Sequence, residues 1–214
     1  MVNLRKHQES APCVTGFRRQ VGGSTQSSLV TASDGHAYIL KFNNHLHGKH
    51  TLFHEALGSE LAQLLGLPVP CWQPLLVSND VLDAHPEMWF ASPEGRLRPG
   101  AGLHFGSRLV CAPAGGSVYE LIPSRWFPRI ANAEDFFGML LLDLWTNNQD
   151  RRQALFLRTE RSSALRALFI DHGQMFGGTA GSFRHRAKRA RFLDERIYDQ
   201  PLSELALNRW ANRI

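Results

Sequence analysis

The chain has 214 residues, 43% of them hydrophobic and 20% charged, which suits one domain or two small lobes and excludes a disordered chain. No apolar run approaches the roughly 20 residues of a membrane-spanning helix, and the polar start lacks the apolar core of a secretory signal, so we expect neither. The net charge of +5 favours anionic ligands such as phosphates without requiring nucleic acid.

The three cysteines, Cys13, Cys71 and Cys111, are far apart and form no CxxC pair. They indicate reduced thiols, which is typical of a cytoplasmic protein, and give no sign of a zinc site.

The N-terminal region predicts strands on either side of a glycine-rich loop. The expected strands are residues 14–17, 29–32 and 38–42. An Asp-Gly turn at Asp34 and Gly35 joins the last two as a hairpin. Gly22, Gly23 and Ser24 open the loop, and small residues of this kind let backbone N–H groups approach a phosphate. A plain surface turn is the alternative.

Lys41 stands inside an apolar strand-like run, where a lysine is unusual unless it is paired or functional. A helix is predicted from Thr51 to about Leu65, ended by Gly66. Glu55 on this helix is expected to reach Lys41 and hold its ammonium towards a phosphate. The alternatives are an outward-pointing edge lysine and a solvated helix glutamate.

Four histidines, His45, His47, His50 and His54, cluster around the start of this helix. His50 and His54 are spaced for one helix face, but no third ligand stands at a recognised spacing. Solvated histidines are the favoured interpretation.

The middle of the chain predicts a connection and strand over residues 69–77, an irregular crossing over 78–102, and another strand over 103–110. We place the link between two lobes here, so residues 1–110 form an N-terminal lobe and residues 111–214 a C-terminal lobe.

The C-terminal half predicts an almost wholly apolar helix from Ala133 to Trp145, capped by Asn132. A polar loop over residues 147–153 follows it. Two short apolar runs, residues 154–157 and 167–170, indicate a hairpin that ends at Asp171. A basic segment at residues 184–191 and an amphipathic helix from Leu202 to Ile214 close the chain.

These parts stand in an order that suits phosphoryl transfer. The reaction needs a cation for the phosphates, carboxylates for the metal, and an acid that orients the acceptor hydroxyl. The chain supplies a small-residue loop, a strand lysine, a helix glutamate, a loop aspartate at Asp150 and a strand-end aspartate at Asp171.

With these motifs the sequence resembles the HipA-like kinases, compact bacterial domains related more distantly to protein and phosphoinositide kinases. The resemblance runs from Gly22 to about Gly178. It rests on the segments 38–42, 55–70, 102–106, 145–153 and 170–173.

The resemblance implies an α+β, bilobal protein-kinase-like fold, with a small β-rich N-terminal lobe and a reduced, mainly helical C-terminal lobe. It implies ATP and Mg²⁺ as cofactors and a hydroxyl-bearing acceptor, with protein serine or threonine expected. Lys41 would contact the α- and β-phosphates with support from Glu55. Asp150 would act at the acceptor hydroxyl, and Asp171 would bind Mg²⁺.

The sequence departs from protein kinases at one metal ligand. Their magnesium-binding asparagine follows the catalytic aspartate by five positions, where this chain has Leu155. Gln153 or Asn148 would have to supply the amide oxygen. The short remainder after Asp171 also shows no activation segment for a peptide substrate.

HipA-like kinases can phosphorylate their own glycine-rich loop, so Ser24, Thr25, Ser27 and Ser28 are candidate autophosphorylation sites. The alternative function is an inactive kinase-like binding module that recognises a protein, or less favourably nucleic acid, through residues 184–191. A metal-dependent hydrolase built on the histidines ranks third.

Overall fold

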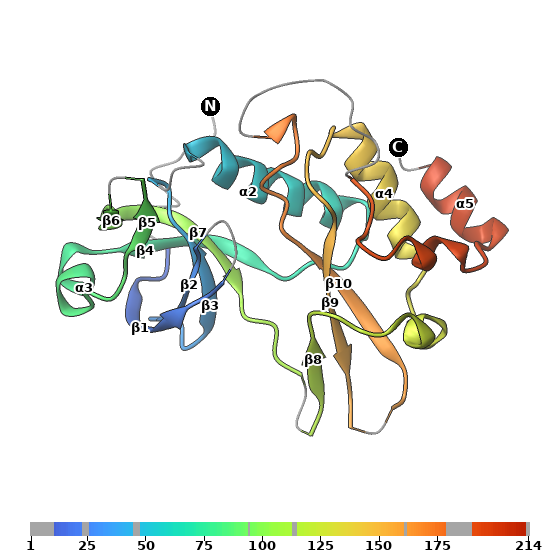
Figure 1. Cartoon of the computed structure of the whole chain (residues 1–214), viewed down its shortest axis with the longest axis horizontal. Coiled ribbons are helices and arrows are strands. Elements are labelled where there is room, and N and C mark those ends of the chain that lie inside the picture. The colour runs from blue at the N-terminus through green and yellow to red at the C-terminus, as the bar shows by residue number, and fades with distance from the viewer. Residues whose placement is uncertain are drawn as a thin grey trace. The chain divides into compact units, whose positions relative to one another are not determined.

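The computed structural model describes residues 11–22, 26–44, 48–93, 95–112, 115–160, 162–178 and 190–212, and Figure 1 labels their helices and strands. Contacts divide the chain into two compact units. The first comprises Met1–Ala56 and Cys71–Leu109, and the second comprises Leu57–Pro70 and Val110–Ile214. The division of the chain into lobes at residues 110 and 111 stays a prediction. Helix α2 (Gly48–Leu64) contributes residues to both units.

The first unit is built on a five-stranded antiparallel sheet in the order β1-β2-β3-β7-β4. Its strands are β1 (Val14–Gln20), β2 (Ser28–Ala32), β3 (Ala37–Lys41), β4 (Trp72–Val77) and β7 (Gly102–Arg108). The predicted Asp-Gly turn joins β2 to β3, and Gly35 has a φ of 79° there, which glycine adopts without strain. A parallel bridge between Cys13 and Leu76 brings the start of β1 beside β4, so the outer strands meet at one end.

Strand β3 lies in the middle of this sheet and has one buried face. Tyr38 and Leu40 are buried in the core, while Lys41 lies on the opposite, half-buried face. The strand pairs with β2 on one side and β7 on the other, where Lys41 lies opposite Phe105. Lys41 is therefore not an edge lysine, and that alternative is wrong.

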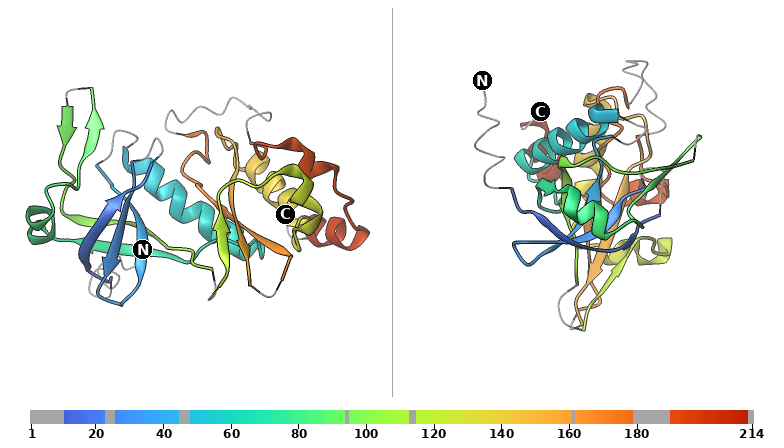
Figure 2. Two further views of the ribbon diagram at one scale, coloured as in Figure 1. Left: turned by 60° about the horizontal axis from the view of Figure 1, so that its bottom comes forward. Right: turned by 90° about the vertical axis from the view of Figure 1, so that its left-hand side faces the viewer.

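Residues 78–102 are more ordered than the turn-forming composition predicts. They include helix α3 (Asn79–Ala84) and a hairpin of β5 (Phe90–Ser92) and β6 (Gly95–Leu97), seen as the green pair of arrows in Figure 2, left. The Ser78 hydroxyl caps α3 by accepting from the Val81 N–H at 3.2 Å. Leu82, Met88 and Phe90 are buried in the first unit's core. The predicted irregular crossing was wrong because these three side chains anchor it.

Helix α2 begins at Gly48, three residues before the predicted start, and ends where the sequence indicates. Gly66 has a φ of 73°. Its N–H donates to the Gln63 carbonyl at 2.8 Å, and the Leu67 N–H donates to the Ala62 carbonyl at 2.8 Å. This pattern satisfies the last carbonyls of a helix and uses glycine for the left-handed residue.

The second unit contains helices and a three-stranded antiparallel sheet in the order β10-β9-β8. Its elements are β8 (Ser117–Tyr119), η1 (Ser124–Arg129), α4 (Asp135–Trp145), β9 (Gln153–Arg158), β10 (Leu165–Ile170), η3 (Glu195–Asp199) and α5 (Glu204–Ala211). The predicted hairpin that ends at Asp171 is β9 and β10, with Gln153 opposite Ile170.

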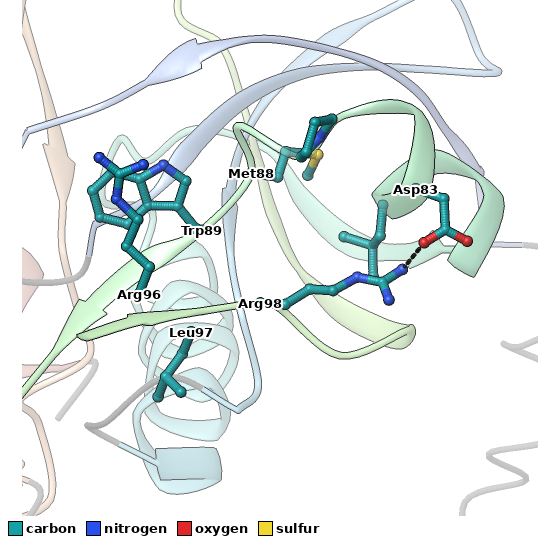
Figure 3. Close-up of a pocket in the computed structure, with 8 residues that line it drawn as sticks. Asp83, Met88, Trp89, Arg96, Leu97 and Arg98 are labelled. Atoms are coloured by element: carbon teal, nitrogen blue, oxygen red, sulfur yellow. Dashed lines mark hydrogen bonds and ion pairs between the residues drawn. The ribbon is translucent and has the colours of Figure 1, made fainter. Parts of the chain in front are cut away.

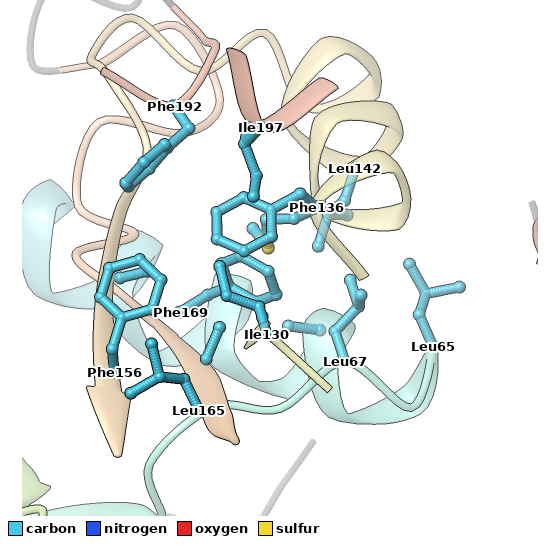
Figure 4. Close-up of a cluster of buried hydrophobic side chains, with 14 of the residues drawn as sticks. Leu65, Leu67, Ile130, Phe136, Leu142, Phe156, Leu165, Phe169, Phe192 and Ile197 are labelled. Atoms are coloured by element: carbon cyan, nitrogen blue, oxygen red, sulfur yellow. The ribbon is translucent and has the colours of Figure 1, made fainter. Parts of the chain in front are cut away.

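Aromatic rings fill the core of the second unit (Figure 4). The Phe136 ring centroid lies 4.9 Å from that of Phe169 and 5.1 Å from that of Phe192, and both pairs meet edge to face. Gly138 is required by close packing, since a Cβ there would lie 2.5 Å from the Trp210 ring of α5. Together these contacts fix α4, which carries the polar loop.

Asn132 does not cap α4 as the sequence predicts. Its amide instead bonds both backbone groups of Ala167, accepting from the N–H at 2.9 Å and donating to the carbonyl at 3.1 Å. The helix begins at Asp135, after Glu134. The amide also donates to the Asp135 carboxylate at 3.0 Å, so the Asn132 side chain joins the start of α4 to β10 instead of capping the helix N–H groups.

Within the part of the chain that the structure describes, no helix combines the length and the apolarity needed to cross a membrane.

Candidate active site

Lys41 and Glu55 form an ion pair in the first unit. Lys41 is the last residue of β3, and Glu55 lies on α2. The side chains of Lys41 and Glu55 are 12% and 3% exposed, so the pair is largely desolvated. The predicted contact is present, and Glu55 is not a solvated glutamate. Their roles towards phosphate stay predictions.

The glycine-rich loop begins at Gly22, whereas Gly23, Ser24 and Thr25 lie outside the described residues. Its two ends are held together by a hydrogen bond from the Val21 N–H to the Ser27 carbonyl at 2.7 Å. Ser27 and Ser28 are 3% and 0% exposed, so neither presents its hydroxyl for the predicted autophosphorylation.

Two glutamines bond this loop to strand β5 and to Trp89, the residue before it. Before the loop, the Gln20 amide donates to the Trp89 carbonyl. After it, the Gln26 side chain accepts from the Ala91 N–H at 2.6 Å and donates to the Ala91 carbonyl at 3.2 Å. Both ends of the loop are therefore bonded to the segment from Trp89 to Ala91.

The polar loop after α4 is folded around Asn148. Its amide donates to an Asp143 carboxylate oxygen at 2.9 Å and accepts from the Asp150 N–H at 3.1 Å. Asn148 is 2% exposed, whereas Asp150 is exposed. The loop thus buries its scaffold and presents the Asp150 carboxylate to solvent.

Asp171 follows β10 and lies beside β9. Its φ of 63° falls in the left-handed region, which aspartate tolerates better than most residues. The Gln153 amide donates to the Asp171 carboxylate at 2.9 Å. Leu155 lies on β9 opposite Leu168, so the position where kinases carry an asparagine is a strand residue here.

The buried pair of Arg152 and Asp143 joins these two segments and was not predicted from the sequence. Arg152 is 2% and Asp143 0% exposed. Arg152 Nε donates to Asp143 Oδ2 at 2.9 Å, and its Nη2 donates to Asp143 Oδ1. Its Nη1 donates to the carbonyls of Ile170 and Asp171, at 2.7 and 2.9 Å, and lies 3.2 Å from His172 Nδ1. One side chain therefore positions both the loop that carries Asp150 and the backbone of Asp171.

Burial raises the pKa of the Asp143 carboxyl, and Arg152 and Asn148 oppose that rise. The sequence contains one feature from which this pair could have been predicted. Asp143 stands within the apolar run Leu140-Leu141-Leu142-Asp143-Leu144, and a buried acid needs a cationic partner.

The segment after Asp171 returns to the polar loop through backbone hydrogen bonds. The N–H groups of Gln149, Phe176 and Gly177 donate to the carbonyls of Gln174, Thr146 and Asn147, at 2.9, 2.6 and 3.2 Å. The predicted loop and the predicted metal aspartate therefore belong to one hydrogen-bonded assembly within the second unit.

Asp171 and Gln153 are the residues that fit a magnesium site. Mg²⁺ prefers oxygen ligands and commonly takes one or two carboxylates, with phosphates and water completing the shell. Gln153 is exposed beside Asp171 and can turn its amide oxygen to a cation. Asn148 is buried, and both ends of its amide are bonded within the loop. Among the described residues, no group of three or more His, Cys, Asp or Glu is arranged for a metal.

Two other predicted features lie partly outside the described residues. His45 and His47 lie outside the described residues, while His50 is exposed and His54 buried. Most of the basic segment, residues 184–189, also lies outside them. Arg191, at its end, forms an ion pair with Glu195 at 2.7 Å.

The fold resembles solved kinase structures. The Golgi casein kinase matches with a TM-score of 0.52 at 13% identity, covering 81% of this chain and 56% of that chain. The same kinase with Mn and ADP bound matches with a TM-score of 0.51 at 12% identity, covering 81% and 57%. Hydra Fam20 with sugar matches with a TM-score of 0.51 at 12% identity, covering 96% and 84%. The chain thus spans a little over half of the Golgi casein kinase.

These likenesses confirm the expected kinase-like α+β fold. No curated protein sequence matches the chain significantly. The profile of the HipA-like kinases matches residues 14–208, which is most of the chain and confirms the resemblance seen in its motifs. The chain belongs to the HipA-like kinase family.

Proposed function

We propose that the chain is an ATP-dependent phosphotransferase that uses Mg²⁺ and transfers the γ-phosphoryl group to a hydroxyl, with protein serine or threonine as the expected acceptor. The observation that carries the proposal is the set of hydrogen bonds that Arg152 makes to the Asp143 carboxylate and to the Asp171 carbonyl, which we call the Arg152 clamp. The clamp holds the Asp150 loop and the Asp171 backbone together. Phosphoryl transfer uses one aspartate at the acceptor hydroxyl and another at the metal, and Arg152 fixes the segments that carry these two candidates. Bound Mn and ADP in one similar kinase structure agree with a nucleotide and a divalent cation.

Each residue has a role under this proposal. Lys41, held by Glu55, neutralises the α- and β-phosphates. The assignment of Gly22, Gly23 and Ser24 to phosphate binding rests on the sequence alone. Asp150 orients the acceptor hydroxyl and accepts its proton, for which its exposure suits it.

The metal is assigned to Asp171 and Gln153, and it would neutralise charge on the transferring phosphate. Asn148 serves the loop as a scaffold residue, because its buried amide already holds Asp143 and the Asp150 backbone.

The test compares nucleotide binding and phosphoryl transfer in wild type, Asp150→Asn and a control, Asp199→Asn, which alters an exposed aspartate of the same unit. We expect wild type to bind ATP only with Mg²⁺ and to phosphorylate itself or a mixed serine and threonine peptide pool. Asp150→Asn should bind ATP unchanged and lose about 10²–10⁴-fold in rate, the usual contribution of a positioned acid or base.

Two results would contradict the proposal. Absence of Mg²⁺-dependent nucleotide binding in wild type would remove the enzyme altogether. Binding without transfer to any hydroxyl would instead make the chain an inactive kinase-like binding module.

A further inference from the structure

A pocket of about 350 Å³ lies within the first unit, between α3 and the β5–β6 hairpin (Figure 3). Leu82 and Met88 contribute apolar side chains to it and are 3% and 2% exposed. Trp89 and Arg96 stand together at one side, with the guanidinium carbon 4.2 Å from the ring centroid. None of these residues belongs to the proposed phosphotransfer site.

The charged groups of the pocket are mostly cationic. Arg98 pairs with Asp83 at 2.5 Å, and Asp83 is the one carboxylate among the lining residues. Arg96 has no carboxylate partner among the residues that the structure describes. Its stacking on Trp89 fixes the guanidinium without consuming its N–H donors, so the group is preorganised for an anion.

The hairpin beside the pocket has an open edge. Within the described residues, β6 pairs with β5 alone, and Gly95, Arg96 and Leu97 are all exposed. An edge strand offers unpaired backbone N–H and C=O groups, which an extended peptide can use as an added strand.

We propose that this pocket is a docking site for an acidic, extended peptide segment of a partner protein. Its acidic side chains pair with Arg96 and Arg98, an apolar side chain enters above Leu82 and Met88, and its backbone aligns along β6. Side chains of an extended peptide alternate, so acidic and apolar residues in alternation meet the cationic and apolar parts of the site. The volume suits one or two side chains, as in small ligand pockets.

The binding test uses an acetylated and amidated pentapeptide of alternating glutamate and leucine, titrated calorimetrically into the whole chain. A second peptide has glutamine in place of glutamate. We expect the acidic peptide to bind at least about tenfold more tightly, because charge-assisted hydrogen bonds are about twice as strong as neutral ones.

Three variants locate the site. Arg96→Gln and Arg98→Gln should each lower the affinity for the acidic peptide about tenfold, which is the usual effect of losing a hydrogen bond to a charged group. The control Arg18→Gln, an exposed arginine of β1, should leave affinity unchanged. Asp83→Asn should strengthen binding, because it frees Arg98 from its present carboxylate partner.

The results of these experiments distinguish a peptide-docking site from a site for a small anion. The proposal is overturned if the acidic peptide does not bind wild type or Asp83→Asn, or if it binds the arginine variants as tightly as wild type. Displacement by equimolar inorganic phosphate would also overturn it, in favour of a small-anion site. None of these readings involves ATP, so they stand apart from the test of phosphotransfer.

Discussion

Among the described residues, the first unit contains the largely desolvated ion pair of Lys41 and Glu55, and the second contains that of Arg152 and Asp143. Lys41 and Glu55 in the first unit retain 12% and 3% side-chain exposure, whereas Arg152 and Asp143 in the second retain 1% and 0%. Arg152 donates to a carboxylate and to two backbone carbonyls, so its hydrogen bonding is directed into the protein. Lys41 stands at a strand end with part of its surface exposed.

Under the proposed function, Arg152 is a structural cation and Lys41 a ligand-binding one. A guanidinium has a rigid fork of donors that can hold several acceptors at once, which suits joining two backbone segments. An ammonium is a compact charge on a flexible stem, which suits a ligand that comes and goes. Stability should therefore depend more on Arg152, and nucleotide affinity more on Lys41.

The largest expected effect is on stability. Arg152→Met leaves the fully buried Asp143 carboxylate without its cation, and removal of one partner of a buried pair typically costs about 3–5 kcal/mol. Urea unfolding should report this loss. Arg166→Met, which alters an exposed arginine of β10, should stay within about 0.5 kcal/mol of wild type.

A double variant tests the cause. Asp143→Leu combined with Arg152→Met removes both charges and should be more stable than Arg152→Met alone, because no unpaired charge is buried. If the double variant is less stable than both single variants, the pair is not the source of the effect.

The next effect is on nucleotide affinity. Lys41→Met should weaken the binding of Mg²⁺-ATP about 10–100-fold through loss of charge-assisted hydrogen bonds. It should cost less stability than Arg152→Met, because the Lys41–Glu55 pair is less completely buried than the Arg152–Asp143 pair. Fluorescent nucleotide titration and urea unfolding measure the two quantities. Ile39→Met places the same side chain on the same face of β3 and should leave affinity intact. A larger stability loss for Lys41→Met than for Arg152→Met would reverse the comparison.

The smallest effect is a pH dependence of the first unit, which buries His104 in addition to the Lys41–Glu55 ion pair. His104 accepts from the Asn43 N–H at Nδ1 and donates from Nε2 to the Gly100 carbonyl, at 3.0 and 2.8 Å, in the tautomer that this network assigns. Burial lowers the pKa of His104 below 6.5, and the bond to Gly100 opposes that shift. The unfolded chain therefore binds a proton more readily below about pH 6.5.

It follows that the His104 contribution to stability is present above about pH 6.5 and is lost as the pH falls through the lowered pKa. Urea unfolding at pH 7 and pH 5 should show a larger loss for wild type than for His104→Gln. His50→Gln, which alters an exposed histidine, should behave as wild type. Equal losses in all three proteins would remove His104 as the cause.

Local pattern predicted much of the fold. Alternation and the Asp-Gly turn identified the β2–β3 hairpin, and Gly66 marked the end of α2. The contact of Lys41 with Glu55 could also be anticipated, since a polar residue in an apolar run demands a partner nearby.

The missed features depend on partners that are distant in sequence. Asn132 looks like a helix cap until β10 supplies Ala167 as a competing partner. The sequence of the β5–β6 hairpin indicates an irregular segment, because it does not show that Met88 and Phe90 are buried in the core of the first unit. Arg152 is one of two adjacent arginines, and only the fold shows that it is the buried one while Arg151 is exposed.

The buried clamp has a consequence for how such chains can change over evolution. An arginine at position 152 without a carboxylate at position 143 would be a buried uncompensated charge, and the reverse would leave a buried acid. A substitution at only one of the two positions lowers the stability of the chain, whereas replacing both residues leaves no unpaired charge in the interior. Positions 143 and 152 should therefore covary among related chains, although neither side chain needs to touch a substrate.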